Sequence, residues 1–168
     1  MLPEPRSVAA PGTGVSDEDV LHAETIVADA EPEQLEGLHR ALSRLWTGMS
    51  TQPELDWRLR FETAVMEIAN NVVEHAYAAE QRRGRIELRL TAYRDRVEAH
   101  FSDRGAPFGR LSVQQEPGIE RAREKMQNPG ALADSGRGLT ITRAAVDTVE
   151  YSRTQGVNRW RLVKLLGA

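Results

Sequence analysis

Glu67, Asn71 and His75 recur every four residues, so on a helix they form one row along its side. A carboxylate in such a row can act as a base, and an amide oxygen one turn away is a hard ligand of the kind that Mg²⁺ accepts. Taken singly, the three residues are more typical of a solvated glutamate, an amide at a packing edge and a core histidine than of a site. The row therefore indicates a site only if other parts of the chain support it.

Two turns that contain glycine offer such support. Asp103 and Gly105 follow an alternating apolar stretch, which puts the carboxylate at a strand end where glycine lets the backbone approach a ligand closely. The run Gly136-Arg137-Gly138 directly precedes a helix predicted over 139–145, whose first N–H groups would face phosphate oxygens. Tight connections explain both turns equally well, and Ile141 breaks the dinucleotide-binding glycine pattern.

The composition narrows the classes of function. The chain of 168 residues carries a net charge of −3 and no cysteine, which excludes disulfides, thiol nucleophiles and zinc ribbons and provides no positive field to attract nucleic acid. The histidine spacing of zinc hydrolases, the P-loop and the serine-hydrolase elbow are all missing. Because no apolar run approaches the roughly 18 residues of a membrane span, we expect a cytoplasmic protein that binds neither membrane nor nucleic acid.

Hydrophobic patterning predicts the elements that must position these groups. Leucines at three- and four-residue steps predict a helix that ends near Gly48, and a capping box from Thr51 to Glu54 predicts the start of a second helix that runs to about Ala78. The second helix carries the row described above. Alternating residues predict strands near 25–28, 86–90, 97–101, 148–153 and 158–166.

The order of these elements predicts one domain with an α/β fold, an α+β two-layer sandwich. Its largely antiparallel mixed sheet would be covered by helices on one face. Residues 1–21 are rich in proline and acidic side chains and predict a disordered lead-in, so the domain is expected to span 22–168. Prolines and glycines interrupt every pattern between about 106 and 135, and a loop of that length is usually functional.

In order and spacing, the three groups resemble the N, G1 and G2 boxes of the GHKL ATPase and kinase superfamily. The boxes read E-x-x-x-N-x-x-x-H-A-Y from Glu67, D-R-G-A-P-F from Asp103 and S-G-R-G-L-T-I from Ser135. Within this superfamily the chain is most similar to the bacterial anti-sigma-factor serine/threonine kinases, over about 25–166. The resemblance implies a Bergerat-type ATP-binding fold in which residues 106–135 form a lid over ATP.

The resemblance also implies a role for each residue. Asn71 would hold the Mg²⁺ that bridges the ATP phosphates, and Glu67 would accept the proton of an incoming serine or threonine hydroxyl. Asp103 would accept a hydrogen bond from the exocyclic amine of adenine, which guanine lacks at that position. The other residues expected to bind the nucleotide are His75, Gly105, Gly136, Arg137, Gly138 and Leu139.

The implied activity is an ATP- and Mg²⁺-dependent kinase that binds a sigma factor and phosphorylates an anti-anti-sigma factor, and the resemblance allows a homodimer. The alternative is a nucleotide-gated regulator that binds its partner without phosphorylating it, and the intact Glu67 favours the kinase. The catalytic domain of a histidine kinase is disfavoured, because no phosphoacceptor helix hairpin precedes the second helix and His39 lies in the one candidate helix.

Overall fold

Five antiparallel strands form one sheet in the part of the chain that the structure describes, residues 20–76, 84–108 and 133–167. The strands of this computed structural model are β1 (Val20–Asp29), β2 (Arg85–Tyr93), β3 (Arg96–Asp103), β4 (Thr148–Thr154) and β5 (Val157–Leu165). The helices are the 3₁₀ turn η2 (Pro32–Gln34), α1 (Leu35–Gly48), α2 (Leu55–Asn71), the π-helical η3 (Val72–Ala76) and α4 (Ala133–Ala145). The strand order is β1-β2-β3-β5-β4.

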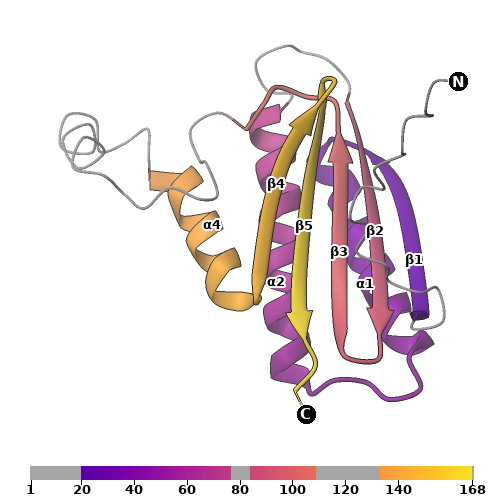
Figure 1. The fold of residues 1–168 in the computed structure, drawn as a ribbon. Coiled ribbons are helices and arrows are strands. Elements are labelled where there is room, and N and C mark those ends of the chain that lie inside the picture. The colour runs from indigo at the N-terminus through magenta and orange to yellow at the C-terminus, as the bar shows by residue number, and fades with distance from the viewer. Residues whose placement is uncertain (1–19, 77–83, 109–132, 168) are drawn as a thin grey trace, which may run out of the picture.

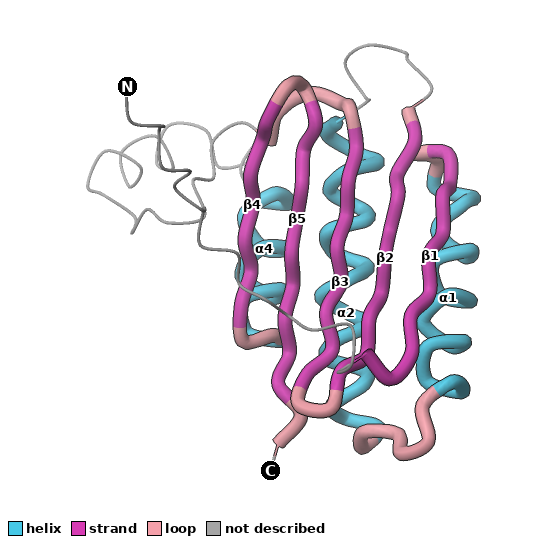
Figure 2. Tube along the Cα trace, turned by 45° about the vertical axis from the view of Figure 1, so that its right-hand side comes forward, coloured by secondary structure: helices cyan, strands magenta, loops and turns pink. Residues whose placement is uncertain are grey.

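The three α-helices cover one face of the sheet and leave the other face open, as Figures 1 and 2 show. All described strand pairs are antiparallel, so the predicted two-layer α/β fold is confirmed. None of the helices that the structure describes is both long and apolar enough to cross a lipid bilayer.

The hydrophobic core lies between the helices and the covered face of the sheet. The apolar face predicted for the second helix is buried, with Phe61, Val65 and Ile68 each 0% exposed. Full burial of such side chains stabilises the fold by roughly 1.5–3 kcal/mol each. The core side of the sheet contributes alternate residues of the middle strands, among them Ile86, Leu88, Leu90, Ala99, Phe101, Trp160 and Leu162.

The second helix begins later than the capping-box prediction placed it. α2 starts at Leu55, Glu54 is its extended N-cap residue, and no side chain caps it. A box from Thr51 would require Gln52 to be helical, but the ring of Pro53 disfavours that conformation for the preceding residue. At its other end the helix changes to the π-form of η3 through 76, and residues 77–83 lie outside the described part.

The last helix begins earlier than predicted. α4 starts at Ala133, so Gly136, Arg137 and Gly138 lie within the helix and do not precede it. The prediction that this run leads into the first unpaired N–H groups was therefore wrong. Glycine weakens a helix, but packing against a neighbouring helix outweighs this local preference at Gly138, as the site geometry shows below.

The first strand is longer than the predicted 25–28. β1 begins at Val20, just before the expected domain boundary, and forms an edge of the sheet against β2. Residues 1–19 and 109–132, which hold nearly all of the predicted lead-in and lid, lie outside the described part. Both therefore stay predictions.

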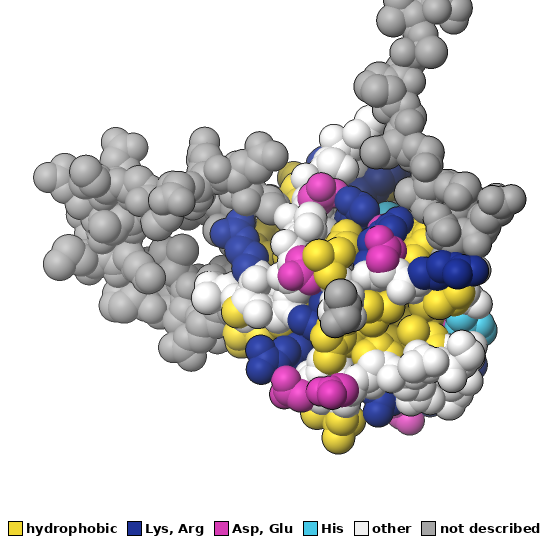
Figure 3. All heavy atoms as spheres, turned by 60° about the horizontal axis from the view of Figure 1, so that its bottom comes forward, with side chains coloured by type: hydrophobic (Ala, Val, Ile, Leu, Met, Phe, Trp, Pro, Cys, Tyr) yellow, Lys and Arg dark blue, Asp and Glu magenta, His cyan; other side chains and the backbone are white. Residues whose placement is uncertain are grey.

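Two contacts attach α2 and α4 to the end of β5. Trp57 Nε1 donates a hydrogen bond to the Leu165 carbonyl at 3.0 Å, and Lys164 Nζ donates one to the Ala145 carbonyl at 2.7 Å. A positive charge is favourable there because Ala145 ends α4. Figure 3 looks onto this end of the molecule, where hydrophobic side chains gather among charged ones. These two contacts help to position α2 and α4 relative to β5.

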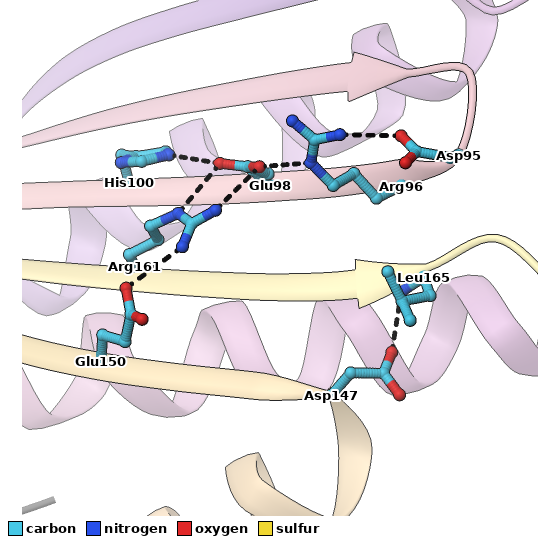
Figure 4. Close-up of polar contacts among 8 residues, drawn as sticks. All are labelled: Asp95, Arg96, Glu98, His100, Asp147, Glu150, Arg161 and Leu165. Atoms are coloured by element: carbon cyan, nitrogen blue, oxygen red, sulfur yellow. Dashed lines mark hydrogen bonds and ion pairs between the residues drawn. The ribbon is translucent and has the colours of Figure 1, made fainter. Parts of the chain in front are cut away.

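The open face of the sheet carries a network of charges centred on Glu98, which is 3% exposed. Its carboxylate accepts hydrogen bonds from Arg96 Nε at 2.6 Å and from Arg161 Nε and Nη2 at 3.1 Å each. His100 Nε2 lies 2.9 Å from Glu98 Oε2, and Arg161 Nη1 also donates a hydrogen bond to Glu150 Oε2 at 3.2 Å, as Figure 4 shows. Burial alone would raise the pKa of Glu98, but the hydrogen bonds from Arg161, Arg96 and His100 lower it to about 2.

We expect Glu98→Gln to lower the free energy of unfolding at pH 7 by about 1–3 kcal/mol, because the buried carboxylate that holds Arg96 and Arg161 by charge-assisted hydrogen bonds is lost. The pKa of Glu98 is lower in the folded state, so its stabilisation is complete above the unfolded pKa of 4.5 and is lost as the pH falls through about 2. Urea denaturation from pH 7 to pH 2 measures this. Glu87→Gln, at an exposed position on β2, is the control, and equal pH profiles for Glu98→Gln and the wild type would contradict the expectation.

Candidate functional site

Glu67 and Asn71 lie one turn apart near the C-terminal end of α2, as predicted. Glu67 is half-buried, and Asn71 is 5% exposed. The Nδ2 atom of Asn71 is buried and has no hydrogen-bond partner among the described residues. Leaving such an atom unpaired costs about 1–3 kcal/mol, so the Asn71 amide retains hydrogen-bonding capacity that a bound group could use. Because rotation of the amide exchanges its nitrogen and oxygen, the same place can hold a donor or an acceptor.

Gly138 brings α4 directly against these two side chains. A methyl group at Gly138 would lie 2.7 Å from Glu67 Oε2 and 3.5 Å from Asn71 Nδ2, and the first distance is so short that a side chain at this position would require the Glu67 carboxylate to move. The Gly138 carbonyl accepts a hydrogen bond from the buried Thr142 hydroxyl at 2.8 Å. The structure thus joins a carboxylate, an amide and a helix backbone at one place.

Asp103 ends β3 and is 4% exposed. Its Oδ1 atom accepts hydrogen bonds from the backbone N–H of Gly105 and from Asn158 Nδ2, both at 2.8 Å. Its Oδ2 atom is buried without a partner in the described chain. Burial raises the pKa of Asp103, whereas the hydrogen bonds from Asn158 and Gly105 and the charge of Arg153 oppose that rise. One oxygen is thus held in place and the other is left for a donor.

The other predicted site residues are placed as follows. Gly105 is buried next to Asp103, and Leu139 is 3% exposed and belongs to the hydrophobic core. Gly136 and Arg137 lie in α4 and His75 lies in η3, but the surroundings of these three residues fall outside what the structure describes. In Figure 1, α2 and β3 both end toward the top of the view. The Glu67–Asn71 pair and Asp103 therefore share one end of the fold.

Sequence reasoning missed the side chains that surround Asp103. Asn158 on β5 lies opposite Asp103 in the β3–β5 register, and Arg153 on β4 lies opposite Asn158. The Tyr151 hydroxyl donates a hydrogen bond to Asn158 Oδ1 at 2.8 Å. A signal was present, because Asn158 is a polar residue at an inward position of a strand whose next inward residues are Trp160 and Leu162.

The described residues contain no group of three or more His, Asp or Glu side chains that could hold a metal ion by themselves. Mg²⁺ is usually held by one or two protein oxygens together with phosphate oxygens and water. Asn71 is compatible with such a shared site, since it could supply one oxygen beside bound phosphates.

The sequence of this chain is similar to those of several known proteins. A family model described as a histidine kinase-like ATPase domain matches residues 28–164. The serine-protein kinase RsbW of Bacillus licheniformis is 30% identical over 94 residues, which are 56% of this chain and 56% of that protein. The protein of the same name from Bacillus pumilus is 30% identical over 95 residues, 56% of this chain and 57% of that protein. The chain thus spans little more than half the length of these two relatives.

A longer match is found with the serine-protein kinase RsbW of Bacillus subtilis. It is 28% identical over 129 residues, which cover 76% of this chain and 76% of that protein. The similarity extends over most of both chains, and the identity is modest throughout.

We expect Gly138→Ala to displace the Glu67 carboxylate while the fold keeps its stability to within about 1 kcal/mol, because alanine favours the helix and the end of a glutamate side chain can move. A crystal structure of the variant would show the new rotamer, and thermal unfolding would measure stability. Gly167→Ala is the matched control, since nothing lies within 4 Å of a methyl group there. A Glu67 rotamer identical to the wild type would contradict the close contact.

Proposed function

The chain belongs to the histidine kinase-like ATPase domain family, and from that premise we propose that it is an ATP- and Mg²⁺-dependent protein serine/threonine kinase. Its substrate would be an anti-anti-sigma factor, and its second partner a sigma factor. The similarity to serine-protein kinases supports the kinase activity. The observation that carries the proposal is that Asp103 Oδ2 and one end of the Asn71 amide are buried without a partner in the described chain. Asp103 Oδ2 would accept from adenine, and the Asn71 amide, once rotated so that its oxygen takes the place of Nδ2, would offer that oxygen to Mg²⁺.

Asp103 would recognise the base. Gly105 and Asn158 occupy Oδ1, so Oδ2 is the oxygen that accepts a hydrogen bond from the adenine exocyclic amine. Guanine presents a carbonyl oxygen at that position, which would face the carboxylate without a proton between them. The unpaired guanine carbonyl and Asp103 carboxylate then cost about 1–3 kcal/mol or more, and adenine is preferred.

Asn71 and α4 would hold the phosphate end. Bound Mg²⁺ supplies the positive charge that neutralises the phosphates, and Asn71 would contribute an amide oxygen to it. We propose that Gly136, Arg137 and Gly138 approach the phosphates from α4, through the Arg137 cation and the close approach that two glycines allow and not through unpaired helix N–H groups, with His75, Gly105 and Leu139 as further nucleotide-binding residues. Gly138 supports this because its backbone lies against Asn71.

Glu67 would act as the general base. It would accept the proton of a substrate hydroxyl while that oxygen bonds to the γ-phosphorus and the bond to ADP breaks. The carboxylate is half-buried one helical turn from Asn71, so the proposed base and the proposed metal ligand would both reach one bound phosphate. This placement is what phosphoryl transfer requires, since positioning supplies most of its rate acceleration.

We expect Asp103→Asn to weaken ATP binding by about tenfold to hundredfold, because an NH₂ group replaces the oxygen that accepts from adenine. The fold should be retained, since the asparagine oxygen can still accept from Gly105 and Asn158 and a buried charge is removed. Calorimetric titration with ATP, with and without Mg²⁺, measures the affinity, and GTP is the control ligand. Unchanged ATP affinity in a folded variant would remove Asp103 from the base-binding site.

We expect Glu67→Gln to lower phosphoryl transfer by about 10²–10⁴-fold with little change in ATP affinity, because the base acts on the incoming hydroxyl and not on the nucleotide. Transfer of labelled phosphate from ATP to candidate anti-anti-sigma proteins measures this. Asp56→Asn, an exposed change at the far end of α2, is the control. ATP binding without any transfer by the wild type would favour a nucleotide-gated regulator over the kinase.

A further inference from the structure

A row of three polar side chains crosses the sheet next to the proposed base-binding carboxylate. Arg153 on β4 pairs with Asn158 on β5, and Asn158 pairs with Asp103 on β3. Gln155 and Gly156 form the turn between β4 and β5 with φ angles of 51° and 77°, which suits a tight hairpin. The hairpin therefore places Asn158 between a cation and a carboxylate.

The Asn158 amide is used at both of its ends. Nδ2 donates to Asp103 Oδ1 at 2.8 Å and to the Ala106 carbonyl at 3.0 Å, while Oδ1 accepts from the Tyr151 hydroxyl at 2.8 Å and from Arg153 Nη1. The residue is 2% exposed and its bond to Asp103 is buried from water, and the four bonds together orient the amide in one way.

The same hairpin holds the segment that follows β3. Arg153 Nη1 donates to the Gly105 carbonyl at 2.9 Å, and the Tyr151 hydroxyl accepts from the Phe108 backbone N–H at 3.0 Å. The Phe108 ring packs edge-on against Trp160 with 4.9 Å between the ring centroids. Residues 105–108 are thus attached to β4 and β5 by both polar and aromatic contacts.

We propose that Asn158 is the positioning residue for base recognition: by holding Asp103 Oδ1 and residues 105–106, it aims the free oxygen of Asp103 at the base without touching the nucleotide. This inference rests on the proposed function, in which Asp103 reads adenine. The β4–β5 hairpin, far along the chain from Asp103, then determines how sharply the site separates adenine from other purines.

Only an amide meets the demands of this position. An aspartate there would place a second carboxylate against Asp103 and the Ala106 carbonyl, and an alanine would leave Asp103 Oδ1 with the Gly105 N–H alone. Asn158→Asp is therefore expected to be more damaging than Asn158→Ala, because like charges are brought together in a buried place.

The experiment compares Asn158→Ala and Tyr151→Phe with the wild type by two readouts. The first is hydrogen exchange of the Gly105 and Phe108 amides in the protein without nucleotide. The second is the ratio of the affinities for ATP and inosine triphosphate, whose base carries a carbonyl in place of the amine. Arg159→Ala is the matched control, because Arg159 neighbours Asn158 on β5 but is exposed on the opposite face.

We expect Asn158→Ala to speed Gly105 exchange and to lower both the ATP affinity and the ATP preference by about tenfold. Tyr151→Phe, which removes a single hydroxyl, should speed Phe108 exchange and cause a smaller loss of preference. Arg159→Ala should match the wild type. The conservative Tyr151→Phe variant keeps the proposal testable should Asn158→Ala fail to fold.

Exchange at the wild-type rate, or an unchanged preference for ATP in a folded Asn158→Ala, would overturn the proposal, since a purely structural role lowers stability without altering selectivity. Failure of the wild type to bind ATP would overturn the proposed function itself. The exchange readout needs no nucleotide, so it would still decide whether Asn158 positions Asp103.

Discussion

The contact of α4 with α2 at Gly138 is the constraint on which the candidate site depends. Because this position has no side chain, the helix backbone reaches both the Glu67 carboxylate and the Asn71 amide. Glycine inside a helix costs up to about 1 kcal/mol relative to alanine. The residue that weakens α4 is thus the one that brings a carboxylate, an amide and main-chain groups together at one place.

The sheet supplies the other half of the site through its register. Pairing of β3 with β5 sets Asn158 opposite Asp103, and a slip by one residue would turn that amide to the open face. The charge network around Glu98 spans β3, β4 and β5 on the open face, so it stabilises the same strand pairings from the other side. The site and the network therefore depend on a common alignment.

The unpartnered atoms of Asn71 and Asp103 are a cost that the rest of the fold must offset, at about 1–3 kcal/mol for each buried group. The apolar faces of α1 and α2 against the sheet provide the offsetting burial. A ligand that forms hydrogen bonds or metal contacts with both atoms would remove this cost. Its binding would therefore stabilise the folded protein.

The sequence by itself determined the features that depend on local spacing. The alternation in β2 and β3, the buried face of α2 with Phe61 and Ile68, and the Glu67–Asn71 row could all be predicted, because side-chain direction repeats regularly along a strand or helix. The start of α4 could not, since the packing of Gly138 outweighs the local preference of glycine, whereas the later start of α2 follows from Pro53, a local signal that the capping-box prediction did not weigh. Only the tertiary structure decided that Gly138 meets Glu67 and that Asn158, 55 residues along the chain, meets Asp103. Those contacts form only when whole elements pack together, and no local pattern records which distant faces will meet.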